Sequence, residues 1–286
     1  MIQKQQPLRI RILAVPDCPL VPRVQDLVDQ CLTQTHIQTA VETTIGDYSS
    51  PTLLINDFDV TGRTTSIRQI SCRLDLPKPE EIIAALRVIP ILDCHDPHEK
   101  LILANAFQAI LATGRRVSIS DICTSTKLDE QTALQRIASM RNAGFLKLDS
   151  DGHIAAAAGL STTPTKHQIT LRGQKLWTWC PLDIIGIFGA LDASGSGTAC
   201  VPGTKEMIQL SFEDGRAREI DGAMLFLVDT STAASLCSDW CPNIGLFPSK
   251  SAGESWMQEN VIQGDLISVA STFNVAQEVW RRILRG

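Results

Sequence analysis

Apolar positions recur along the chain with two different periods, and their order divides it into three parts. In residues 1–92, short apolar runs of strand length alternate with segments of helical spacing. The predicted order is a strand at 8–15, a helix at 20–32, a strand at 37–44, the hairpin SSPTLLINDFDVTG and a helix at 79–88. We therefore expect this part to be an α/β domain.

The second part, residues 93–160, has helical spacing through LILANAFQAILATG, SISDICTSTKL and DEQTALQRIASMRNAGFL. The next segment, LKLDSDGHIA, is typical of a two-stranded wing, so the order predicts a winged-helix-like helical segment. A DNA-binding module should carry a basic face, but residues 94–155 hold seven Lys or Arg and seven Asp or Glu. A helical scaffold is therefore favoured over nucleic-acid binding.

The third part, residues 161–286, is predicted to open with two strands that meet at a turn of Arg172 and Gly173. A helix follows Trp179, and further strands are predicted at EMIQLSF and AMLFLVD. The whole chain is therefore expected to belong to the α+β class.

The composition of the chain disfavours several classes of function. A chain of 286 residues with 44% hydrophobic content can bury the cores of two or three domains, and its formal charge of −5 gives no general attraction to nucleic acid or to an anionic membrane. No run is long enough to span a bilayer, and Arg9 and Arg11 interrupt the first apolar run, so no signal peptide is expected. Nine cysteines in such a chain indicate reduced thiols and a cytoplasmic location.

The segment LWTWCPLDIIG holds the first candidate site. Pro181 is favoured at the first helical position, which makes Cys180 the N-terminal cap. The unpaired N–H groups and the positive end of the helix dipole should then favour the thiolate form of Cys180. Asp183 falls at the third helical position, from which its side chain can turn back toward the cap. Trp177 and Trp179 are expected to pack beneath this turn, and a role in lining an apolar pocket is left open.

A second thiol cluster, LCSDWCPNIGLF, places Cys237 and Cys241 after the predicted strand AMLFLVD. Two thiolates from different loops of a sheet can converge on one soft metal ion. These residue types are compatible with a two-thiol site shared with Cys180, and a purely structural role for Asp183 in the first turn of its helix is left open.

The connector VIPILDCHDPHEK gathers Cys94, His95 and His98, which are residue types that bind metals. No second ligand pair stands at the spacing of a zinc finger. Asp96 or Asp93, followed by a proline, is typical of a helix start. This interpretation is favoured over a metal site.

Together these motifs resemble the organomercurial (alkylmercury) lyase family over about residues 98–286. The shared features are the winged helical part, the TPTKHQITLRG strand pair, the WCPLD turn, a TAC segment, WCPNIGLF and an E-x-W element at Glu254–Trp256.

The resemblance implies that Cys180 and Cys241 are the catalytic cysteines, that Asp183 is the catalytic aspartate and that Cys200 is structural. Pro242 follows Cys241, where the family usually has another cysteine or histidine-rich residues. Cys237 therefore stays open as the alternative second thiolate.

The implied reaction is protonolysis of a carbon–mercury bond. Mercury is soft and prefers thiolate sulfur, so two cysteines push electron density onto the carbon, and Asp183 delivers the proton as a general acid. The products are a hydrocarbon and Hg(II) held by Cys180 and Cys241. No cofactor is implied. The partners are the organomercurial, Hg(II), and low-molecular-weight thiols or a mercuric reductase that accepts the product; a homodimer is left open.

Residues 1–92 resemble a thioredoxin-like domain. Cys18 follows the first strand, where that family keeps its nucleophilic thiol, and Pro51 stands where it keeps a cis-proline. Val21 replaces the second cysteine of the CxxC motif, so dithiol exchange is not expected, although Cys72 could complete a thiol pair in space. The domain is either an accessory thiol domain or a degenerate structural one.

Two other classes of function remain as alternatives to the enzyme. A soft-metal carrier needs the thiols but no acidic group that protonates carbon, so the presence of Asp183 favours the enzyme. A winged-helix regulator needs a basic face, so the neutral helical segment disfavours it. A diverged enzyme of the same fold with another substrate is also left open.

Overall fold

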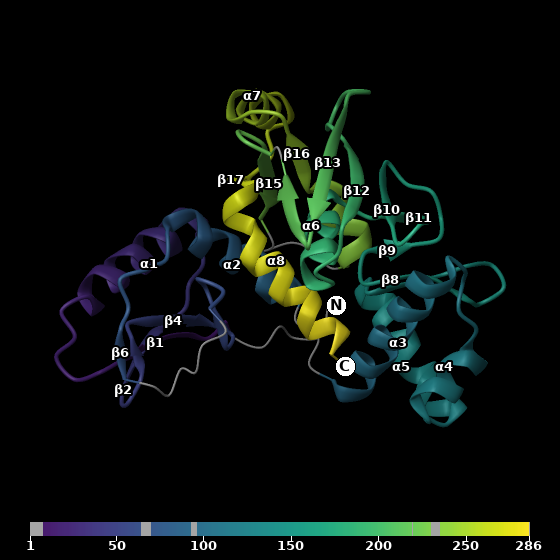
Figure 1. Cartoon of the computed structure of the whole chain (residues 1–286), viewed down its shortest axis with the longest axis horizontal. Coiled ribbons are helices and arrows are strands. Elements are labelled where there is room, and N and C mark those ends of the chain that lie inside the picture. The colour runs from purple at the N-terminus through teal and green to yellow at the C-terminus, as the bar shows by residue number, and fades with distance from the viewer. Residues whose placement is uncertain (1–7, 64–69, 93–95, 219, 230–234, 286) are drawn as a thin grey trace.

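The computed structural model describes residues 8–63, 70–92, 96–218, 220–229 and 235–285 (Figure 1). The described residues of the first part form one side of the molecule, the helices of the second part form the other, and the sheets of the third part lie between them with the C-terminal helix. No helix of the described residues is both long and apolar enough to cross a bilayer.

The first part is built around a mixed sheet with the strand order β2-β1-β4-β5. Its elements are β1 (Ile10–Ala14), α1 (Val21–Thr35), β2 (Val41–Ile45), β3 (Ser49–Ser50), β4 (Thr52–Ile55), β5 (Phe58–Asp59), β6 (Ser71–Cys72) and α2 (Pro79–Leu92). Strand β1 pairs in parallel with β2 and antiparallel with β4. The predicted element order is therefore confirmed, and the Ser50–Pro51 bond is cis, as the resemblance implies.

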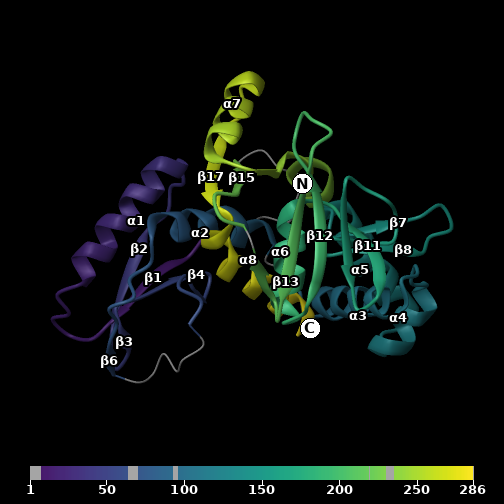
Figure 2. The same ribbon diagram turned by 45° about the horizontal axis from the view of Figure 1, so that its top comes forward.

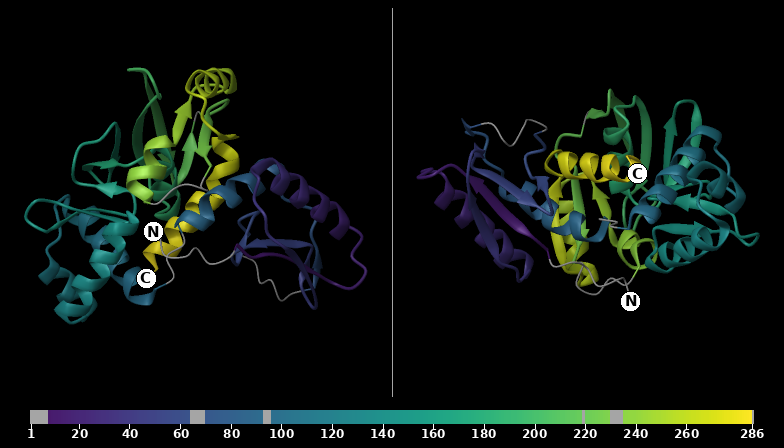
Figure 3. Two further views of the ribbon diagram at one scale, coloured as in Figure 1. Left: turned by 180° about the vertical axis from the view of Figure 1, so that it is seen from behind. Right: turned by 90° about the horizontal axis from the view of Figure 1, so that it is seen from below.

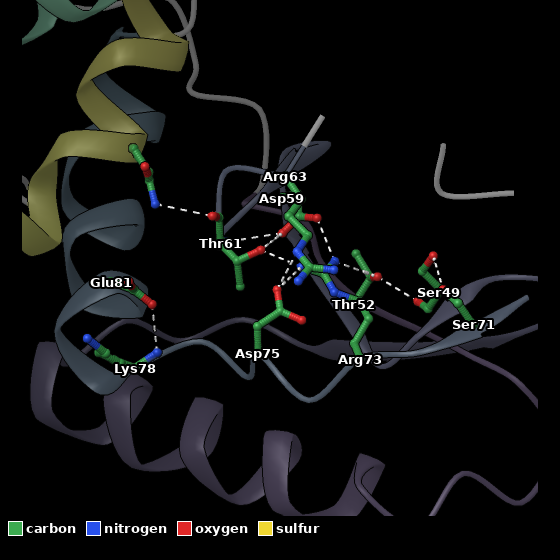
Figure 4. A network of polar contacts seen from close by, with 11 residues as sticks. Ser49, Thr52, Asp59, Thr61, Arg63, Ser71, Arg73, Asp75, Lys78 and Glu81 are labelled. Carbon is green, nitrogen blue, oxygen red and sulfur yellow. Dashed lines mark hydrogen bonds and ion pairs between the residues drawn. The ribbon is translucent and has the colours of Figure 1, made fainter. Parts of the chain in front are cut away.

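A buried arginine ties the hairpin β4–β5 to strand β6 (Figure 4). The Arg73 side chain is only 3% exposed, and its Nη1 donates to Asp59 Oδ2 at 2.7 Å and to Thr52 Oγ1 at 2.9 Å. Its Nη2 donates to Thr61 and to Asp75. Because a buried charge is costly without partners, this network fixes the segment that carries Cys72.

The second part follows the predicted order closely. It comprises α3 (Pro97–Thr113), α4 (Ile119–Thr126), α5 (Glu130–Ala143), β7 (Leu146–Leu148) and β8 (Ile154–Ala157). Asp96 caps α3, since its Oδ1 accepts from the backbone N–H groups of His98 at 2.9 Å and Glu99 at 3.0 Å. This outcome confirms the predicted helix start. Cys94 and His95 lie outside the described residues.

The third part continues the sheet of the second. An eight-stranded sheet has the order β14-β13-β12-β10-β11-β9-β8-β7, and a three-stranded sheet has the order β16-β15-β17. The remaining strands are β9 (Leu160–Ser161), β10 (His167–Leu171), β11 (Gln174–Thr178), β12 (Gly195–Cys200), β13 (Met207–Glu213), β14 (Arg216–Arg218), β15 (Met224–Val228), β16 (Gly245–Phe247) and β17 (Gly264–Ser268). The turn predicted at Arg172 and Gly173 is confirmed, because both residues have positive φ between β10 and β11.

Three helices complete the fold: α6 (Pro181–Ala190), α7 (Lys250–Asn260) and α8 (Val269–Leu284). Helix α8 packs against both α6 and α2, and so lies between the first part and the rest (Figure 3). Gly186 allows the close approach of α6 to α8, since a Cβ there would overlap the ring of Trp280. One hydrophobic core runs through all three parts as a result.

Candidate active site

Cys180 and Asp183 occupy the first turn of α6. Strand β11 ends at Thr178, and Cys180 keeps an extended backbone as the N-cap residue before Pro181 at the first helical position. The Asp183 side chain turns back, and its Oδ2 accepts from the Cys180 N–H at 2.7 Å. The predicted cap and the predicted position of the carboxylate are both confirmed.

Cys241 lies close to these two residues, although it follows a strand of a different sheet. It follows a short helical turn, η1 (Leu236–Trp240), that comes after β15. The two sulfur atoms and a carboxylate oxygen of Asp183 all lie within 4.8 Å of one another. The expectation that both thiols come from loops of one sheet is wrong, because β11 and β15 belong to different sheets. The convergence itself agrees with the predicted two-thiol site.

Burial governs the ionisation of this group. Cys180, Asp183 and Cys241 are 0%, 2% and 2% exposed. Burial raises the pKa of Cys180, raises that of Cys241 well above its usual range and raises that of Asp183 to about 7. The predicted thiolate at Cys180 is therefore wrong for the isolated protein: the nearby N–H groups favour the charged form, but loss of solvation outweighs them.

Two buried tryptophans precede the two cysteines. Trp179 is 7% exposed and Trp240 is 0% exposed. Lys147 lies over Trp179, with its Nζ 5.4 Å from the ring centroid, and its charge opposes the effect of burial on the pKa of Asp183. Trp179 is thus packed beneath the turn as expected, whereas Trp177 is half-buried. Sequence reasoning missed Lys147, which no motif distinguishes from other exposed lysines.

Cys237 does not join the group. Its sulfur is buried 3.9 Å from Ser235 Oγ and 3.8 Å from Ser238 Oγ. Among the described residues, the thiol and acid group around Cys180 contains Cys241 and not Cys237. This geometry favours Cys241 as the second thiol.

The other predicted thiols also lie elsewhere. Cys200 is half-buried at the end of β12, with its sulfur 3.5 Å from the Thr204 carbonyl oxygen. Cys18 is partly buried before α1, and Cys72 is exposed on β6 in register with Ser50. None of the three belongs to the group around Cys180 in the described part of the chain.

The fold around this site is similar to that of a solved structure. A structure described as the mercury-bound form of MerB2 is similar to this chain with a TM-score of 0.62 and 22% identity, over 68% of this chain and 95% of that chain. Residues 160–281 match the family model MerB, alkylmercury lyase, and are called the lyase domain below.

Two relatives named alkylmercury lyase agree with this match. The protein of Streptomyces lividans is 24% identical over 62% of this chain and 81% of its own length. The protein of Staphylococcus epidermidis is 24% identical over 60% of this chain and 79% of its own length.

Proposed function

We propose that this protein is an organomercurial lyase that cleaves carbon–mercury bonds by protonolysis. The observation that carries the proposal is the buried group of two sulfur atoms and one carboxylate oxygen within 4.8 Å. Two thiols offer the linear coordination by soft ligands that mercury prefers, and the carboxyl is close enough to pass a proton to a carbon bound there. The relatives named alkylmercury lyase support the same activity.

The proposed reaction balances without a cofactor. An organomercurial carried by an external thiolate exchanges that ligand for Cys180, and the external thiol leaves with the proton of Cys180. Cys241 then binds mercury and gives its proton to Asp183, which delivers it to the carbon as the carbon–mercury bond breaks. One hydrocarbon is released, and Hg(II) stays on the two sulfur atoms. Because burial keeps the Cys241 thiol protonated, the one proton that the carbon receives is already in the site.

The test is to incubate the purified protein with phenylmercury and excess thiol and to measure benzene. The lyase should release one benzene for each carbon–mercury bond broken. A protein that binds mercury but releases no benzene would be a soft-metal carrier, and the proposal would be wrong.

The first and second parts have proposed roles as well. We propose that residues 1–92 are a thioredoxin-like domain, supported by the element order and by Cys18 between β1 and α1. Residues 93–160 are proposed to be winged-helix-like and to act as a scaffold, because β8 pairs with β9 of the lyase domain. Product Hg(II) is proposed to leave to cytoplasmic thiols or a mercuric reductase, with Cys18 as an intermediate acceptor.

A further inference from the structure

The turn between β8 and β9 lies directly against the Asp183 carboxyl group. Gly159 in this turn has φ +88°, a backbone conformation that favours glycine. A Cβ built on Gly159 would lie well under 3.0 Å from both Oδ1 and Cγ of Asp183, and 3.0 Å from its Cβ. No larger residue fits at this position while the carboxyl keeps its place.

Three hydrogen bonds hold the turn in position. Trp280 Nε1 donates to the Ala158 carbonyl at 3.0 Å, and the Ala158 N–H donates to the Phe145 carbonyl at 3.0 Å. The Trp179 N–H donates to the Gly159 carbonyl at 3.1 Å. The turn is therefore fixed to α8, to the residues after α5 and to the segment that carries Cys180.

The carboxyl group is thus held between two pieces of backbone. Gly159 blocks one side, and on the other the Cys180 N–H donates to Oδ2. We propose that Gly159 is a positioning residue, which keeps the Asp183 carboxyl facing the mercury ligands Cys180 and Cys241. This inference rests on the proposed role of Asp183 as the proton donor. A displacement of about 1 Å in a reacting group can cost a factor of about 10² in rate, so small movements of this turn should be visible in turnover.

The test compares two glycines in similar backbone conformations. In Gly159→Ala, kcat for benzene release from phenylmercury should fall at least about tenfold, while KM and the affinity for Hg(II) stay within about twofold, because both sulfur atoms are untouched. Gly152→Ala is the matched control: Gly152 has φ +81°, and a Cβ there meets no heavy atom within 4 Å. The control should lose stability to the same backbone strain as Gly159→Ala, but it should retain the wild-type kcat.

Two further variants separate positioning from general damage. Asp183→Ala removes the two atoms that the new Cβ would overlap, so adding Gly159→Ala to it should cause no further loss of rate. Trp280→Phe keeps a ring against Gly186 but removes the donor to Ala158, and should lower kcat in the same direction by less. If Gly159→Ala alone fails to fold, the double variant with Asp183→Ala should fold, and Trp280→Phe then supplies the rate measurement.

The outcomes distinguish this inference from the function on which it rests. Wild-type kcat in Gly159→Ala, or an equal loss with and without Asp183, would overturn the positioning role. Failure of the double variant to fold would overturn it too, since the overlap would then not be with the carboxyl. If Asp183→Ala itself cleaves at the wild-type rate, the proposed proton donor is wrong.

Discussion

At the scale of single residues, helix geometry brings Cys180 and Asp183 together. The N-cap and the third helical position face each other across the first turn, so one hydrogen bond at 2.7 Å fixes the carboxyl beside the sulfur. Cys241 has no such local relation and depends on the packing of a second sheet. Substitutions near Cys241 should therefore be tolerated to a different extent from substitutions near Cys180.

Replacing Cys241 by serine should abolish benzene release and weaken Hg(II) binding, because a hydroxyl is a harder and less acidic ligand than a thiol. Replacing Cys237 in the same way should do much less, since its sulfur lies with Ser235 and Ser238. Benzene release and Hg(II) affinity are to be measured for both variants. Equal losses would show that the second thiol has been assigned wrongly.

His167 on β10 should make stability depend on pH. Burial, with a smaller effect from Lys166, lowers its pKa from 6.5 to about 4. The unfolded chain therefore binds a proton that the folded protein does not, so stability is full above pH 6.5 and falls as the pH drops toward 4. His167→Gln should remove this dependence, as judged by urea unfolding at pH 7 and pH 5. The raised pKa of Asp183 makes stability change with pH in the opposite direction. Asp183 is present in both proteins, so this contribution cancels when the variant is compared with the wild type. The same pH dependence in both proteins would contradict the assignment.

At the scale of elements, local patterns predicted the β10–β11 hairpin, the start of α6 and the helices of the second part. Each has its signal within a few residues, such as the Pro181 start or the Arg172–Gly173 turn. The ionisation of Cys180 was predicted wrongly because burial depends on α8 and on the second sheet, which lie far away in the sequence. Gly159 was missed because only the folded chain brings it against Asp183; a glycine between two short apolar strands was its one sequence signal.

Arg87 links helix α2 to strand β17. It is 3% exposed, and its Nε lies 2.8 Å from Asp265 Oδ2, which is itself buried. Arg87→Ala should lower the free energy of unfolding by about 3–5 kcal/mol, because it leaves the Asp265 carboxylate buried without its cation. Arg218→Ala, at an exposed pair with Glu213, should change it by less than about 1 kcal/mol. Urea unfolding of both variants checks this, and similar losses would contradict the structural role of Arg87.

At the scale of the whole molecule, the first part is packed onto the lyase domain through α2 and α8 (Figures 1 and 3). Glu80 Oε2 accepts from Ser268 Oγ at 2.6 Å, at the start of α8. Because Trp280 of the same helix holds the turn beside Asp183, removal of residues 1–92 would disturb the site as well. A point substitution is therefore the cleaner test of the first part.

Cys18→Ser should leave single-turnover cleavage unchanged but slow multiple turnover when external thiol is scarce. Hg(II) on two sulfur atoms leaves slowly unless another thiol attacks it, and Cys18, in the turn between β1 and α1, is the proposed acceptor. Cys123→Ser, on α4, is a control that should have no effect. Steady-state benzene release at limiting thiol measures the difference. Wild-type cycling by the variant would make the first part a structural module.

The central claim is that a proton from the Cys180, Asp183 and Cys241 group replaces mercury on carbon. The most direct measurement is mass spectrometry of the benzene released from phenylmercury in D₂O after full exchange of the thiols. The account predicts benzene with one deuterium from the wild-type protein. It also predicts release slowed by about 10²- to 10⁴-fold, with Hg(II) binding retained, in Asp183→Ala. Benzene without deuterium, or wild-type release from that variant, would contradict it.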